Sequence, residues 1–399
     1  CLVGSEMCIR DREITGKAIS GEWGQDDDTG TGIPVLRTTN FTNEGFVNYK
    51  NVVTRSILKK NIAEKYLRHG DVIIEKSGGS DKQPVGRVIF FEGEENKYLF
   101  NNFTGLLRVQ NPEEWLPKYV FYALYAYYRN GGTRAFENRT TGLHNLQVDN
   151  YVKSVDIPKL SYRKQQHICE TLDHVRDAVA YRERQLTKLD ELIKARFVEM
   201  FGDPVNNPLH WKKVKLSELA DIKIGPFGSL LHKEDYVTGG HPLVNPSHII
   251  DGKIIVDNDL TLTDEKYSEL ISYHLKKDDI VLGRRGEMGR CAVVDREGLL
   301  CGTGSLLLRP TGVVTADYIQ KIISFPTFKK TIEAMAVGQT MPNLNVPIVS
   351  NFMIILPPLS VQKEYYDFVA EVDKSKADVQ KALDQTQLLF DSLMQQYFG

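Results

Sequence analysis

Two glycine-rich loops with basic side chains are the segments best suited to contact a polyanion. Residues 75–82 read EKSGGSDK and residues 283–290 read GRRGEMGR, and each loop follows an apolar run that predicts a buried strand. Glycine lets a backbone approach phosphate closely, and arginine can bind phosphate or the edge of guanine. Either loop alone would most simply be a solvated hairpin tip, but their equivalent placement puts a binding role on an equal footing with that interpretation.

A second pair of polar loops precedes the long helical segment of each half. Residues 138–145 read NRTTGLHN and residues 338–343 read GQTMPN. Asparagine and glutamine can read adenine, and hydroxyl groups can bind phosphate, so these loops also fit DNA. The candidate DNA-binding residues are Lys76, Ser77, Lys82, Arg87, Arg139, Thr140, Thr141, His144, Asn145, Arg284, Arg285, Arg290, Gln339, Thr340 and Asn343.

One acidic group could instead belong to a metal-dependent nuclease. Asp71, Glu75 and Lys76 lie close together in sequence, but the glutamate and the lysine are adjacent rather than separated by one residue. In the second half, Asp279 is followed by Gly283, with no carboxylate at the matching place. A structural role at a strand end is therefore the better interpretation, and a stand-alone nuclease stays as the alternative.

Other catalytic patterns are missing from the sequence. It has no GxxxxGK[ST] phosphate-binding loop, no Asn-Pro-Pro-Tyr tetrapeptide and no histidines at metal-ligand spacing. We therefore predict no catalytic residue, no metal site and no cofactor bound by this chain.

The composition limits the kinds of protein to consider. A chain of 399 residues with 26% charged residues is typical of a globular protein with two or three domains. The formal net charge of -2 excludes a histone-like coating protein and requires any DNA-binding surface to be local. No apolar run approaches the length of a membrane span, and the five cysteines form no CxxC pair. We expect a cytoplasmic protein.

The sequence contains an internal duplication. Similar segments recur in the same order at an offset near half the chain, which indicates two copies of one domain, each followed by a helix. The loops differ between the copies, so the two domains would recognise two different half-sites. The matched segments are 32–40 and 240–248, 67–74 and 275–282, 86–89 and 289–292, 104–108 and 303–309, 145–146 and 343–344, 157–161 and 356–360, and 201–202 and 398–399.

Heptad patterns predict two long helices that pair with each other in antiparallel fashion. A helix over 162–200 would be roughly 60 Å long at 1.5 Å per residue, enough to hold two domains more than one turn of B-DNA apart. The bundle could also bind a partner protein. Arg182, Arg196, Lys376 and Thr386 interrupt the apolar seams and would set the register. The seam residues are Leu172, Val179, Leu186, Ile193, Val369, Val372, Leu383 and Phe390.

Residues 1–12 differ from the rest of the chain. CLVGSEMCIRDR lacks an initiator methionine and resembles translated sequencing-adaptor read-through. We expect a non-native or disordered segment here, and we find no counterpart in the first copy to residues 211–220, which open the second. The true start of the gene is expected to be missing, which leaves the first domain truncated at its N-terminus.

The duplicated layout resembles the specificity subunit of Type I restriction-modification enzymes from about residue 13 to residue 399. The resemblance rests on the two Pro-Leu-Ser segments, 158–161 and 357–360, that open the helices, on the closing segment 200–204, and on the half-starts 32–34 and 211–220. The family pattern Pro-Pro-Leu-x-x-Gln places a glutamine at Gln362. The first copy departs from it with Arg163, followed by Gln165 and Gln166.

The resemblance implies an α+β chain: two similar mixed α/β target recognition domains separated by two long antiparallel coiled-coil helices. Each domain would read one part of a bipartite double-stranded DNA target. The helices would dock methyltransferase subunits, two of them by expectation, and restriction motor-nuclease subunits. S-adenosylmethionine, ATP and magnesium would then belong to those partners. The implied segments are 1–12, target recognition domain 13–160, spacer helix 161–201, target recognition domain 202–358 and spacer helix 359–399.

Two further alternatives remain open at this point. The chain could be the specificity chain of a related system whose partner combines nuclease and methyltransferase in one subunit. It could also be a helical scaffold that binds only proteins.

Overall fold

The structure is a computed structural model that describes residues 8–140, 143–336 and 343–399. The chain forms two compact units. The first unit comprises the residues up to 185 together with 379–399, and the second unit comprises 186–378. Each unit therefore contains one part of each long helix.

The first unit is built on two small sheets. The central sheet is antiparallel, in the order β2 (Ile19–Ser20), β10 (Thr104–Leu107), β6 (Val72–Glu75) and β8 (Val88–Phe90). The other sheet has the order β3 (Gln25–Asp26), β5 (Val53–Ser56), β4 (Ile33–Leu36) and β9 (Leu99–Phe100), and its last pair is parallel. Helix α2 (Pro117–Arg129) packs on β8, and its aromatic residues 119, 121, 122 and 125 are buried in the core.

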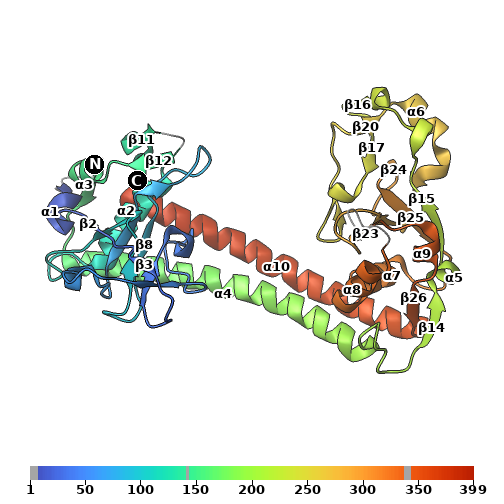
Figure 1. Cartoon of the computed structure of the whole chain (residues 1–399), viewed down its shortest axis with the longest axis horizontal. Coiled ribbons are helices and arrows are strands. Elements are labelled where there is room, and N and C mark those ends of the chain that lie inside the picture. The colour runs from blue at the N-terminus through green and yellow to red at the C-terminus, as the bar shows by residue number, and fades with distance from the viewer. Residues whose placement is uncertain (1–7, 141–142, 337–342) are drawn as a thin grey trace. The chain divides into compact units, whose positions relative to one another are not determined.

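The second unit repeats this arrangement. Its central antiparallel sheet has the order β15 (Ala220–Ile224), β25 (Ser305–Pro310), β22 (Ile280–Gly283) and β23 (Cys291–Val293). Its other sheet has the order β16 (Tyr236–Val237), β20 (Thr261–Leu262), β17 (His241–Val244), β24 (Leu299–Cys301) and β21 (His274–Leu275). Strands β17 and β24 are parallel, like β4 and β9. The predicted pair of similar mixed α/β domains is confirmed (Figure 1).

Shorter elements complete the two units. A three-stranded sheet in the first unit has the order β11 (Glu137–Thr140), β12 (Leu143–Leu146) and β7 (Ser77–Gly78). The first unit also contains helix α3 (Val148–Ser154). The second unit contains the hairpin β18 (Ile249–Ile250) and β19 (Lys253–Ile254), with helices α6 (Asp264–Glu269), α7 (Ala316–Ile323), α8 (Pro326–Met335) and α9 (Val346–Ser350). No helix in the described part of the chain is both long enough and apolar enough to cross a membrane.

The expectation that residues 8–12 lie outside the fold is wrong. Strand β1 (Cys8–Arg10) pairs with β13 (Asp156–Pro158) and leads into helix α1 (Asp11–Thr15). Strand β14 (Lys212–Lys215) pairs with β26 (Met353–Leu356) and leads into α5 (Leu216–Leu219) in the same way. The first copy thus has a counterpart to the opening of the second. The sequence did not reveal it, because backbone pairing with β13 tolerates almost any side chain. The part of the expectation that concerns residues 1–7 lies outside the described residues.

The side chains that open these two short helices differ in polarity. Leu216 opens α5 and Asp11 opens α1, and both are fully buried. The hydroxyl of Thr15 donates to Asp11 Oδ1 at 2.8 Å, whereas Asp11 Oδ2 has no hydrogen-bond partner among the described residues. Burial raises the pKa of Asp11 to about 7 because a low-dielectric interior disfavours the charged carboxylate.

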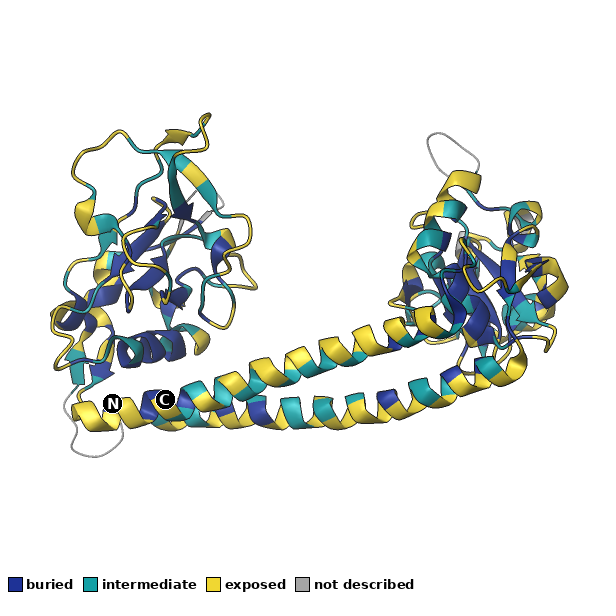
Figure 2. Ribbon diagram, turned by 90° about the horizontal axis from the view of Figure 1, so that it is seen from below, coloured by how far each residue is buried: buried dark blue, intermediate teal, exposed yellow. Residues whose placement is uncertain are grey.

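The two predicted long helices are α4 (Tyr162–Phe201) and α10 (Leu359–Phe398), and within each unit they run antiparallel side by side (Figure 1). The buried and half-buried positions of each helix contact either the partner helix or the globular part of the same unit, and exposed positions cover the rest (Figure 2). Of the predicted seam residues, Leu172, Ile193, Val372 and Phe390 are buried, and Val179, Leu186, Val369 and Leu383 are half-buried.

The polar residues that interrupt the seams have partners on the opposite helix. Arg182 donates to the Thr386 hydroxyl, and Arg196 lies 2.9 Å from Glu364. Lys376 Nζ lies 2.6 Å from an oxygen of Asp190. A polar residue in an apolar seam costs stability in any other alignment, where it loses its partner, so these pairs favour the observed register.

Candidate nucleic-acid interface

An ion pair between an arginine and a buried aspartate opens the central strand of each unit. Arg108 makes two hydrogen bonds to Asp71, at 2.7 Å each, just before β6. Arg309 binds Asp279 in the same bidentate way, at 2.8 and 2.7 Å, just before β22. Both aspartates are 2% exposed. This clamp joins two strands of the central sheet and fixes where the following loop begins.

The clamp and a second ion pair argue against the nuclease alternative. Glu75 is buried and its carboxylate pairs with Arg87 at 3.3 Å, while Asp71 is held by Arg108. Each acidic group therefore already has a cationic partner. Among the described residues, no group of three or more histidine, cysteine, aspartate or glutamate side chains is placed to hold a metal ion.

Lys76 and Arg284 occupy equivalent positions where the central strands end. The Lys76 N–H donates to Phe103 O at 2.8 Å, and the Arg284 N–H donates to Gly304 O at 2.9 Å. The carbonyl of Lys76 accepts from Leu146 N at 2.8 Å, and that of Arg284 accepts from Leu344 N at 3.0 Å. In each unit, these backbone bonds bring the first predicted loop against the second.

The side chains of these two residues lie in partly dehydrated surroundings. Lys76 Nζ donates to the Ser20 hydroxyl at 2.8 Å, and Arg284 Nε donates to Leu344 O at 3.1 Å. Burial lowers the pKa of both side chains, and a neighbouring cation, Lys65 or Arg285, lowers it further. A cation that is partly dehydrated loses less hydration when an anion approaches, so these positions suit phosphate or a base edge.

The three-stranded sheet assembles the first-unit candidates. Asn145 is opposite Ser77, and His144 is opposite Gly78, across β12 and β7. Asn145 and Ser77 are half-buried. His144 is 9% exposed and its Nδ1 lies 3.2 Å from Glu137, so the imidazole is turned into the unit rather than toward a ligand. The backbone of β11 includes Arg139 and Thr140.

Arg87 and Arg290 brace the fold from equivalent strand positions. Besides Glu75, Arg87 binds the carbonyl of Thr38 at 3.1 Å. Arg290 binds the carbonyl of Pro246 at 3.2 Å and Glu287 at 2.8 Å. These acceptors within the protein occupy most of the N–H groups of the two arginines. Sequence spacing alone did not distinguish such structural arginines from exposed ones.

The remaining candidates fall into two groups. Lys82 and Arg285 are exposed, and Asn343 is half-buried with an Oδ1 that has no hydrogen-bond partner among the described residues. Thr141, Gln339 and Thr340 lie outside the described residues. In the second unit the bond from Leu344 N to Arg284 O brings Asn343 close to Arg284 and Arg285.

Comparison with known proteins finds a family model that matches part of the chain. Residues 208–386 match the family model described as Type I restriction modification DNA specificity domain. This part of the chain is similar to Type I DNA specificity domains. It is also 20% identical over 372 residues to the Type I restriction enzyme MjaVIII specificity subunit of Methanocaldococcus jannaschii, covering 85% of this chain and 84% of that protein.

Solved structures agree with this assignment at the level of the fold. The S subunit of a Type-I restriction-modification system from M. genitalium is 16% identical, with a TM-score of 0.53, and the match covers 100% of this chain and 98% of that one. A chain from a structure on complex assembly and conformational transition of the type I R-M system is 17% identical, with a TM-score of 0.62 and the same coverage of 100% and 98%. The predicted resemblance to specificity subunits is confirmed.

Sequence reasoning missed part of the surface around the first-unit loops. Lys17, Ser20, Asn102 and Phe103 line a cavity together with Lys76 and Asn145. The sequence carried no signal for Phe103, because its 52% exposure depends on the turn that anchors it.

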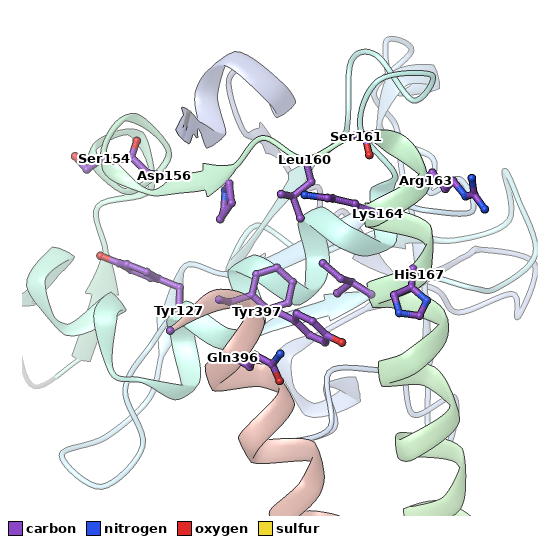
Figure 3. Close-up of a pocket in the computed structure, with 14 residues that line it drawn as sticks. Tyr127, Ser154, Asp156, Leu160, Ser161, Arg163, Lys164, His167, Gln396 and Tyr397 are labelled. Carbon is purple, nitrogen blue, oxygen red and sulfur yellow. The ribbon is translucent and has the colours of Figure 1, made fainter. Parts of the chain in front are cut away.

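A second cavity, of about 950 Å³, lies elsewhere in the first unit (Figure 3). The first turns of α4 line one side with Arg163 and His167, and the end of α10 lines another with Gln396 and Tyr397. None of the candidate DNA-binding residues lines it. Its larger volume therefore does not identify it as the DNA interface.

Proposed function

We propose that this chain is the sequence-reading subunit of a Type I restriction-modification complex and that each unit reads one half of a bipartite DNA target. The observation that carries the proposal is the equivalence of Lys76 and Arg284. The same scaffold holds a different cation at the same place in each unit, with the same backbone bonds around it.

The differences between the two reading surfaces support unequal half-sites. Arginine can bind O6 and N7 of guanine together, whereas lysine acts as a compact point charge. The second unit has two adjacent arginines, Arg284 and Arg285, where the first has Lys76 and Ser77. Identical surfaces would favour a palindrome, so these surfaces favour an asymmetric target.

We also propose that α4 and α10 act as spacer and docking site. A helix of 40 residues is about 60 Å long at 1.5 Å per residue. Exposed apolar residues on these helices, such as Tyr181 at 58% and Leu388 at 69%, support a protein-binding role for the bundle. The proposed partners are methyltransferase subunits and restriction subunits, which would bring S-adenosylmethionine, ATP and magnesium, and the proposed location is the cytoplasm.

The experiment is a footprint of the chain assembled with its methyltransferase partner. The expected result is protection of two short DNA segments separated by unprotected base pairs. Protection that does not depend on the DNA sequence would overturn the proposal. No protection of DNA in any assembly would also overturn it, and would favour a scaffold that binds only proteins. The neighbouring genes would show whether the methyltransferase and nuclease partners are separate subunits or are combined in one subunit.

A further inference from the structure

A cavity of about 450 Å³ lies among the reading loops of the first unit. Four segments line it: 17–20, 76–77, 102–103 and 145–149. We call it the loop cavity. It includes three residues already assigned to DNA reading, namely Lys76, Ser77 and Asn145, so it belongs to the same face.

Phe103 is the most exposed large apolar side chain of this lining, at 52%. The backbone beneath it is well anchored. Its carbonyl accepts hydrogen bonds from Lys76 N at 2.8 Å and Ser77 N at 3.2 Å. The next residue, Thr104, is fully buried and donates to the carbonyl of Asn101 at 2.8 Å. An exposed ring on an anchored turn is preorganised to meet a flat apolar ligand.

The chemistry around the ring matches a nucleotide. Two ammonium groups, those of Lys17 and Lys76, accompany one carboxylate, that of Asp149, in the lining. Lys76 is held toward the cavity by its 2.8 Å bond to Ser20. Amide groups of Asn102 and Asn145 add donors and acceptors. Cations for phosphate beside an aromatic face for a base are the usual elements of nucleic-acid surfaces that use stacking.

From these observations, and on the basis of the proposed function, we infer that Phe103 stacks on a base of the first half-site while Lys17 and Lys76 bind the adjacent phosphates. The ring contacts the face of a base at an opened step, as apolar wedges do when they enter a groove. Phe103 thereby adds shape-dependent recognition to the hydrogen-bond reading by Asn145.

The second unit has no aromatic side chain at the equivalent position. The residue equivalent to Phe103 is Gly304, since each accepts the backbone bond of the first loop residue. At this position the second half-site would therefore meet a glycine, next to Arg284. The two units then differ in mode of reading as well as in the bases read.

The test uses the chain assembled with its methyltransferase partner and DNA duplexes carrying the target mapped for the wild-type complex. Base stacking contributes about 1 to 3 kcal/mol per base by alanine substitution, which corresponds to roughly 5- to 140-fold in affinity. Phe103→Ala is expected to weaken binding by that factor, and Phe103→Tyr to restore most of it. Leu58→Ala is the matched control, because Leu58 is 74% exposed in the same unit but does not line the cavity.

A spectroscopic readout separates stacking from a structural effect. With 2-aminopurine placed at successive positions of the first half-site, one position should respond to the wild type and to Phe103→Tyr but not to Phe103→Ala. The same probe in the second half-site should be unaffected by either variant, which also shows that the variant is folded. Equal affinities and probe signals for Phe103→Ala and Leu58→Ala would overturn the inference alone. Failure of the wild-type complex to bind any specific target would overturn the proposed function.

Discussion

Replacing the buried Asp11 by leucine is expected to stabilise the first unit at neutral and higher pH. The carboxylate has one hydrogen-bonding hydroxyl and no cation among its hydrogen-bond partners in the described chain, and the equivalent helix opens with Leu216. Thr15 would keep an acceptor after the substitution, because its hydroxyl also lies 3.2 Å from the carbonyl of Asp11.

The size of the effect follows from the pKa. Burial raises the pKa of Asp11 from 3.8 to about 7, and each unit of difference between folded and unfolded states corresponds to about 1.36 kcal/mol. The ionised carboxylate therefore costs at most about 4 kcal/mol. Because the folded pKa is the higher one, the folded state binds the proton more tightly. Stability should thus fall as pH rises from about 4 to about 7, by about 2.5 kcal/mol between pH 5 and pH 8.

The assay is urea unfolding of the first unit at pH 5 and pH 8, followed by the fluorescence of Trp23 and Trp115 in a Trp211→Phe background. Asp11→Leu should raise the free energy of unfolding more at pH 8 than at pH 5. Asp11→Asn is the matched control, since it removes the charge and keeps an acceptor for Thr15. If Asp11→Leu and Asp11→Asn both retain the pH dependence of the parent, the reasoning about this carboxylate is refuted.

Three further predictions concern the repeated features. Arg108→Ala should destabilise the first unit by about 3 kcal/mol, since it leaves Asp71 buried and unpaired. Arg309→Ala should cost the second unit less, because the Arg309 side chain is 37% exposed against 16% for Arg108; urea midpoints would check both, and an equal loss would contradict the role of burial. Arg284→Ala should weaken binding by about 1 to 3 kcal/mol, at the second half-site alone. Titration of duplexes with one altered half-site measures this, and a loss spread over both half-sites would contradict it.

Much of the fold could be predicted because the sequence contains two copies of the same domain. The segments around Asp71 and Asp279 repeat, and so do the heptads that end near Phe201 and Phe398. Because the repeated segments occur in the same order in both halves, chance similarity does not explain them. The helix bounds Tyr162–Phe201 and Leu359–Phe398 agree with the expected 161–201 and 359–399 to within one residue. Periodic apolar seams specify long helices strongly, which explains this success.

The site was harder to predict because loop composition does not show which partners a side chain finds. Arg87, Arg290 and Arg285 are all arginines in or next to glycine-rich loops, so the sequence treats them alike. In the structure, carbonyl and carboxylate groups of the protein bind Arg87 and Arg290. Phe103 was missed because its exposure depends on the turn that anchors it. The prediction for residues 8–12 was wrong for another reason. Strand β1 joins the fold through backbone hydrogen bonds, which the unusual composition of residues 8–10 does not prevent.

The most direct test is to map DNA modification in a host that carries this chain with its methyltransferase partner, and to repeat it with Arg284 and Arg285 both replaced by alanine. If two units read two different half-sites, the map should show one motif with two defined parts and a gap of fixed length, and only one part should relax in the variant. A single uninterrupted or palindromic motif, or a variant that relaxes both parts equally, would contradict the claim that two units read two different half-sites.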